Sequence, residues 1–256
     1  DLSYEGHEIF FNKDANHFKQ ERERKAREKF HGFENSAVDT SGRDQSEWSK
    51  NTEEWFQEKY LKPSNSLVDN TLENSTSLEE IKDRYSIEPE KEVFGVGGSS
   101  EARNRLENFL NRIESYSGCI SSPSKAEAST SHLSPYIRYG CISIREVYQK
   151  AKERKKETSD TQSVEMFMDR LFWQQHFNQK IEDNPKLFKE AINPVYQELN
   201  KENNDKNLVK TWKNGETGFP LIDASMRALK QTGWLNFRMR AMSASFFSYI
   251  LKQWWK

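Results

Sequence analysis

The chain has 256 residues, of which 34% are hydrophobic, and its mean hydropathy is -1.00. No apolar run approaches the roughly 18 residues that a membrane-spanning helix needs, and no signal peptide opens the sequence. Two cysteines, Cys119 and Cys141, are too few for a disulfide framework or a zinc site. These features exclude membrane and disulfide-scaffold classes, and they predict a soluble intracellular protein.

The net charge of -1 conceals an asymmetry along the chain. Residues 101–256 contain 25 Lys and Arg against 18 Asp and Glu, a net charge of +7, whereas residues 1–100 carry a net charge of -8. A basic C-terminal part can meet a polyanion, although +7 is modest for a dedicated nucleic-acid binder. The charge alone therefore leaves the partner open.

The first 60 residues indicate helical fragments rather than a complete domain. Residues 16–30 are highly charged with few apolar anchors, which is typical of a solvated helix or one packed along a narrow edge. A better amphipathic stripe follows, formed by Trp48, Trp55, Phe56 and Tyr60. Residues 63–79 then have the composition of a linker.

After Phe94 the chain is consistently helical in pattern. Ser99 or Ser100 is predicted to cap a helix whose apolar positions are Ala102, Leu106, Phe109, Leu110 and Ile113. Ser143 and Glu146 form a capping-box pattern ahead of a second helix. A third helix carries Trp173, and its Phe167, Leu171 and His176 lie near one face.

Residues 212–247 predict a turn followed by two helices. Pro220 suits the first turn of a helix, and Gly233 suits the left-handed residue that closes it. The apolar stripe between them is formed by Leu221, Ile222, Ala224, Ala228 and Leu229. Asp223 and Arg227, four residues apart on this helix, are predicted to make a structural pair.

The second of these helices carries Arg238 and Arg240. Two residues correspond to about 200° of rotation, so the guanidinium groups point to roughly opposite sides. One can face an interior anion while the other faces an external phosphate, because the arginine fork bonds phosphate oxygens in pairs. The alternative is two solvated arginines on an amphipathic helix.

The order of these blocks resembles the photolyase/cryptochrome flavoproteins. The match rests on GGSSEARNRLENFL (97–110), TSHLSPYIRYGCIS (130–143), MFMDRLFWQQHFNQKIEDNP (166–185) and the TGFPLIDASMRALKQTGW block (217–234). It covers about Phe94 to the C-terminus. SSP at 121–123 and LNFRMRAM at 235–242 are similar to the wording of a bacterial cryptochrome/photolyase subgroup.

The resemblance implies an all-α fold, the helical FAD-binding domain of this family. Residues 1–62 would be a short helical remnant of the α/β antenna domain and residues 63–93 a linker. Residues 94–256 would be the FAD-binding domain, incomplete at its C-terminus because the family's segments around the isoalloxazine ring come later. The implied function is light-driven electron transfer from FAD to a pyrimidine dimer in DNA, although whether this chain is itself an enzyme stays open.

Hydroxyl side chains around residue 131 form the first candidate cofactor site. Thr130, Ser131 and Ser134 surround the start of a short helix, where hydroxyls and free N–H groups make an anion site, with ordinary capping as the alternative. The resemblance assigns FAD contacts to Tyr116, Thr130, Ser131, Leu133, Ser134 and Arg240, to His132 in place of the family's arginine, and to Arg170 in place of a glutamate.

A second set of residues is expected at DNA. The resemblance places Trp173 where the family has a tryptophan that stacks on a flipped pyrimidine dimer. Stacking on an aromatic ring suits capture of a base. The alternative is a tryptophan buried in the core. Gln174 stands where many photolyases have an arginine, Phe237 where they have an asparagine, and Arg238 at a DNA-phosphate position.

These departures from the family's usual residues leave two alternative functions open. One is a non-repairing blue-light receptor with a protein partner, and the other is a cofactor-free helical binding remnant. No catalytic residue, metal or membrane partner is predicted.

Overall fold

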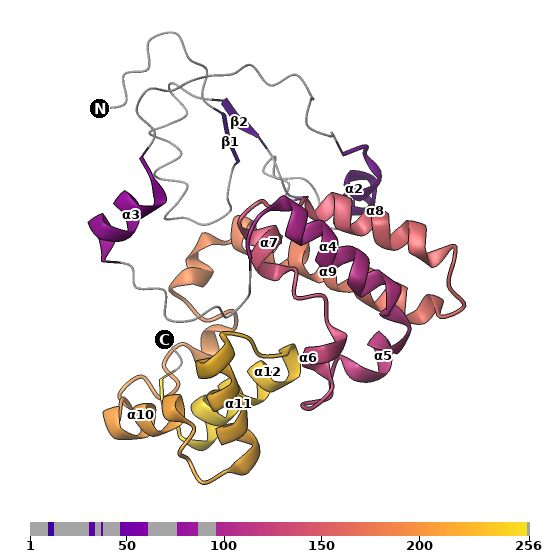
Figure 1. Cartoon of the computed structure of the whole chain (residues 1–256). Helices are drawn as coiled ribbons and strands as arrows, with labels where there is room; N and C mark the ends of the chain where they lie inside the picture. The colour runs from indigo at the N-terminus through magenta and orange to yellow at the C-terminus, as the bar shows by residue number, and fades with distance from the viewer. Residues whose placement is uncertain are drawn as a thin grey trace.

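The computed structural model describes residues 10–12, 31–33, 37, 47–60, 76–86 and 96–254, and most of these residues are helical (Figure 1). The α-helices are α2 (Trp48–Gln57), α3 (Leu78–Tyr85), α4 (Ser99–Asn111), α5 (Tyr116–Cys119), α6 (Ala126–Ser129), α7 (Ser134–Arg138), α8 (Ile144–Lys155), α9 (Thr161–Asp183), α10 (Lys206–Asn214), α11 (Pro220–Thr232) and α12 (Phe237–Ser245). Shorter helical turns are η2 (Ile113–Ser115), η3 (Pro185–Phe188), η4 (Pro194–Tyr196) and the π-helical η5 (Phe246–Ile250). The predicted helical class is confirmed.

Two short strands near the N-terminus differ from the helical fragments predicted there. β1 (Phe10–Asn12) pairs in parallel with β2 (His31–Phe33), with Phe10 opposite His31. Aromatic residues favour strands when a partner is available, and a partner 21 positions away gives no signal in the local helical periodicity. The charged run at 16–30 lies outside the described residues.

The larger core is built from α4, α8 and α9, with α2 packed against them. Phe109, Ile113, Val147 and Val164 are fully buried in it. Phe56 of α2 is also fully buried, and its ring lies 4.5 Å from that of Tyr148 in a stacked pair. A helix assigned by sequence to the antenna remnant thus contributes to this core, while the proposed domain boundaries stay a prediction.

Two predicted helix caps are wrong in detail. Ser99 or Ser100 was predicted to cap α4, but the N-cap is Gly98, which has a φ of +99°, and the helix begins at Ser99. Ser143 does cap α8, accepting from the N–H of Arg145 at 3.2 Å. Glu146 does not close the box, because Arg103 of α4 binds its carboxylate at 2.8 Å.

A smaller core joins α10, α11 and α12. It consists of Ile222, Met226 and Phe246, with Trp212, Met242 and Leu251 packed against them. Pro220 is the first residue of α11, and Gly233 closes that helix with a φ of +68°. Both predicted ends of α11 are confirmed. None of the helices in the described part of the chain is both long and apolar enough to span a membrane.

Asp223 and Arg227 of α11 brace one loop, and among the described residues no salt bridge joins the two. The Asp223 carboxylate accepts from the Thr217 N–H at 2.8 Å, the Thr217 hydroxyl at 2.6 Å and the Gly218 N–H at 2.9 Å. Arg227 donates to the carbonyl oxygen of Gly215 at 2.5 Å. Burial alone would raise the pKa of Asp223, but these hydrogen bonds and the nearby Arg227 charge lower it below its ordinary value of 3.8.

Acid is therefore expected to loosen this loop. A lowered folded-state pKa means that the stabilisation is present above the unfolded value and is lost as the pH falls through the folded value. We expect Asp223→Asn to lower the melting temperature at pH 7 and to flatten its decline below about pH 4. The exposed Glu216→Gln change in the same loop is the control and should leave the pH profile of thermal unfolding unchanged. Parallel profiles for the wild type and Asp223→Asn would contradict the assignment.

Candidate functional site

The turn between α6 and α7 holds the hydroxyl groups predicted at the cofactor. The side chains of Thr130 and Ser131 are half-buried, and Ser134 is exposed. Arg112 fixes the backbone of the turn by donating to the carbonyl oxygen of Thr130 at 3.2 Å. Leu133 is only 2% exposed, so its side chain belongs to the core. Its backbone N–H donates to the Ser131 hydroxyl at 3.4 Å.

His132 sits at the centre of this turn with a φ of +51°. Its Nε2 lies 2.7 Å from the carbonyl oxygen of Glu127 and 3.3 Å from the Thr130 hydroxyl. Because a carbonyl oxygen only accepts, we assign the Nε2 proton to the bond with Glu127. The imidazole ring also packs on Trp234, with centroids 4.8 Å apart and planes inclined at 49°.

Residues 234–236 connect this turn to the helix that carries Arg240. Asn236 is buried, and it caps α12 by accepting from the Met239 N–H at 2.9 Å. Its side-chain amide nitrogen donates to the carbonyl oxygens of Ile120 at 3.4 Å and Ser122 at 3.3 Å. Arg240, which is exposed, donates its Nε–H to the carbonyl oxygen of Leu235 at 2.6 Å. The start of α12 accordingly lies beside the segment between α5 and α6.

The bracing role of Asn236 was missed by sequence reasoning. An asparagine directly before a helical segment is a common N-cap, so part of the signal was present. Its two long-range carbonyl contacts had no local signal.

Tyr116 at the start of α5 and Arg170 on α9 lie close enough for the arginine charge to act on the tyrosine. Tyr116 is 4% exposed, and its ring makes edge contacts with Phe109 at 5.5 Å and Phe167 at 5.7 Å. Burial raises the pKa of Tyr116, and the positive charge of Arg170 opposes that rise. The ring of Tyr116 thus belongs to the core, and its contact with a flavin stays a prediction.

Trp173 lies on an open face of α9. It is 50% exposed, which rules out the alternative of a buried core tryptophan. Its ring contacts His176 at a centroid distance of 5.6 Å and Phe177 at 5.9 Å. Arg170 and Gln174, three residues before and one after it, are also exposed. This face can offer an aromatic platform flanked by a cation and an amide.

The remaining two predicted residues lie on the first turn of α12. Phe237 is 70% exposed and Arg238 is exposed as well. The structure therefore places the predicted residues in three neighbourhoods. Two of them, the α6–α7 turn and α12, are joined by residues 234–236, and the third lies on α9.

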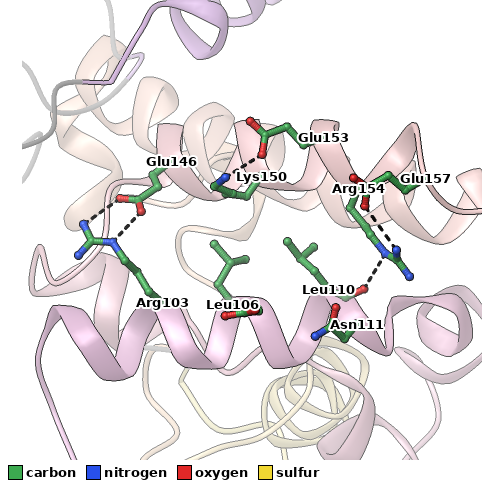
Figure 2. Close-up of a pocket in the computed structure, with 10 residues that line it drawn as sticks. Arg103, Leu106, Leu110, Asn111, Glu146, Lys150, Glu153, Arg154 and Glu157 are labelled. Carbon is green, nitrogen blue, oxygen red and sulfur yellow. Dashed lines mark hydrogen bonds and ion pairs between the residues drawn. The ribbon is translucent and has the colours of Figure 1, made fainter.

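A separate groove of about 420 Å³ lies between α4 and α8 (Figure 2). Leu106 and Leu110 contribute apolar surface to it, and Figure 2 shows charged groups bonded along α8 and between α8 and α4. Lys150 pairs with Glu153 at 2.8 Å, and Arg154 donates to the carbonyl oxygen of Leu110 at 3.2 Å. None of the sequence-predicted site residues is among those that line it. Its charges largely satisfy one another, so it is not the candidate site.

The chemistry of the α6–α7 turn and α12 suits an anionic cofactor such as FAD. Two half-buried hydroxyls, the exposed Ser134 and the exposed guanidinium of Arg240 offer donors for a pyrophosphate. Arg240 uses its Nε–H on Leu235, which orients the guanidinium and leaves its terminal N–H groups for a ligand. The residues present therefore fit the phosphate end of such a cofactor.

Comparison with known proteins agrees with this chemistry. Residues 167–256 match the family model described as the FAD binding domain of DNA photolyase. The chain is 28% identical over 197 residues to the deoxyribodipyrimidine photo-lyase of Halobacterium salinarum, covering 76% of this chain and 40% of the relative. It is 33% identical over 176 residues to cryptochrome-1 of Spalax judaei, covering 67% of this chain and 30% of the relative.

A solved structure supports the same fold. The class III photolyase of Agrobacterium tumefaciens superposes with a TM-score of 0.70 at 20% identity, over 96% of this chain and 55% of that one. The fold and the matched family model define a helical FAD-binding domain. The chain belongs to the photolyase/cryptochrome family. It spans less than half the length of the two curated relatives.

Proposed function

We propose that this chain is the flavin-holding part of a photolyase-like protein that acts on pyrimidine dimers in DNA. The observation that carries the proposal is the half-exposed Trp173, a large apolar ring kept at the surface of α9 rather than in the core. Its neighbours Arg170 and Gln174 are exposed beside it. Such a platform suits stacking of an extrahelical base.

In this proposal the α6–α7 turn and α12 hold the cofactor. The hydroxyls of Thr130 and Ser131 donate to the pyrophosphate, and Arg240 neutralises its charge. The Leu133 N–H orients the Ser131 hydroxyl by donating to it at 3.4 Å. When bound, FAD supplies the absorption of blue light and the transfer of one electron to the dimer. The protein's own contribution is position and electrostatics.

The DNA contacts come from two exposed helix faces. Trp173 stacks on the dimer, Gln174 offers its amide to a base edge or phosphate, and Arg238 on the first turn of α12 binds a backbone phosphate. Phe237 is 70% exposed and adds apolar surface next to that arginine. The net charge of +7 over residues 101–256 favours a polyanionic partner.

A second candidate is a blue-light receptor without repair activity, with a protein partner in place of damaged DNA. Arg170 and Gln174 favour it, because both exposed positions next to Trp173 depart from the residues that many photolyases use. The similarity to a cryptochrome at 33% identity is compatible with either function.

One experiment separates these functions. The chain is incubated with FAD, freed of excess, and illuminated with dimer-containing oligonucleotides, with dark and undamaged controls. Bound flavin and light-dependent loss of dimers are the expected results. Bound flavin without dimer loss selects the receptor, and failure to retain FAD overturns the proposal in favour of a cofactor-free remnant. A Thr130→Ala/Ser131→Ala double variant should weaken FAD binding about tenfold or more, because it removes two hydrogen bonds to a charged group.

A further inference from the structure

We propose that His132 is a positioning residue that locks the α6–α7 turn to the segment before α12, so that Ser131 and Arg240 face one pyrophosphate. This inference rests on the proposed function, because it concerns how the same site holds FAD. The chain has a histidine where related proteins commonly place an arginine. The geometry gives that histidine a different task from direct phosphate binding.

The first observation is that the imidazole is already engaged within its own turn. Nε2 donates to the carbonyl oxygen of Glu127 at 2.7 Å and lies 3.3 Å from the Thr130 hydroxyl. The backbone of His132 has a φ of +51°, a left-handed conformation that costs free energy in a residue with a side chain. The bond to Glu127 spans five residues and offsets that cost by closing the turn.

The second observation is the contact between the His132 and Trp234 rings at 4.8 Å. The backbone around Trp234 is fixed, because the Thr232 hydroxyl accepts from the Trp234 N–H at 3.1 Å. The next residue, Leu235, supplies the carbonyl oxygen that binds Arg240 Nε at 2.6 Å. A displacement of Trp234 would therefore be passed to the group that orients Arg240.

A direct phosphate ligand and a positioning residue respond differently to pH. An imidazolium bound to phosphate would make FAD bind more tightly as the pH falls through about 6.5. The Nε2–H bond to Glu127 exists in both protonation states, so a positioning histidine predicts little change over the same range.

The test is a double-mutant cycle on FAD affinity, measured by flavin fluorescence. We expect His132→Ala and Trp234→Ala each to weaken binding about tenfold, and the double variant to be little worse than either, because both break the same link. Additive losses, about a hundredfold in the double variant, would overturn the inference, and so would unchanged affinity in His132→Ala.

Two further variants separate positioning from misfolding. His132→Gln places an amide donor near the position of Nε2 and should restore part of the affinity for FAD that His132→Ala loses. His176→Ala removes a histidine that contacts Trp173 and Phe177 on α9, and it should leave the affinity for FAD unchanged. Failure of His132→Gln to recover any affinity, or a wild-type affinity that rises steeply below about pH 6.5, would count against positioning. A wild-type chain that binds no FAD would instead refute the proposed function.

Discussion

Replacing Trp173 by alanine is expected to weaken binding to dimer-containing DNA by about fivefold to a hundredfold, while FAD affinity stays unchanged. Stacking of a base on an aromatic ring contributes about 1–3 kcal/mol. Because Trp173 is 50% exposed, its removal takes little from the core, and the fold should persist. Titration of labelled oligonucleotides with and without a dimer measures the difference.

A conservative variant and a distant control sharpen that expectation. Trp173→Phe keeps a smaller ring and should fall between the wild type and alanine. Tyr139 is 83% exposed and lies outside the proposed interface, so Tyr139→Ala should bind the damaged DNA as the wild type does. Equal affinity of the wild type and Trp173→Ala for the dimer would remove lesion stacking from the proposal. Full light-dependent repair by Trp173→Ala would do the same.

Local patterns predicted much of the helical fold. The apolar spacing of α4 places Ala102, Leu106, Phe109 and Leu110 on one buried face, as expected from their positions. Pro220 and Gly233 mark the ends of α11, because each residue has a backbone preference that acts locally. Patterns of this kind depend only on neighbouring residues, so they predict the local structure without knowledge of the tertiary contacts.

Features that depend on distant partners were not predictable. Glu146 looked like a capping residue, but a stronger charged partner, Arg103, lies 43 positions away. Gln175 is 2% exposed and accepts from the backbone N–H of Ala37, a contact across 138 positions. Phe56 enters the core of a domain to which its sequence position did not assign it. Tertiary contacts override local preference at these positions.

The candidate site shows the same division. The motifs selected the hydroxyl turn and Arg240, and the structure ties both to residues 234–236. The motifs could not show that the Leu133 side chain is buried or that the His132 imidazole is engaged by Glu127. Residue type and spacing indicate which atoms are available, whereas the choice among competing partners depends on packing.

Gly215→Ala is expected to destabilise the α10–α11 connection more than any other glycine-to-alanine change in this loop. Gly215 has a φ of +67°, and a Cβ added there would lie 2.5 Å from the carbonyl oxygen of Asp223 and 2.9 Å from Arg227 Cγ. The left-handed backbone costs about 1–2 kcal/mol for a residue with a side chain. Overlap with helix backbone adds about 1–3 kcal/mol, because that backbone cannot move without disturbing α11.

Gly218→Ala isolates the steric part of this effect. Gly218 also has a positive φ, +82°, but a Cβ there meets nothing within 4 Å. The two variants therefore share the conformational cost, and the difference between their free energies of unfolding in denaturant measures the overlap with Asp223. We expect Gly215→Ala to be the less stable of the two and to release the hydrogen bond from Arg227 to the Gly215 carbonyl oxygen. Equal stability would mean that α11 shifts freely, and would weaken the view that Asp223 and Arg227 hold this loop in place.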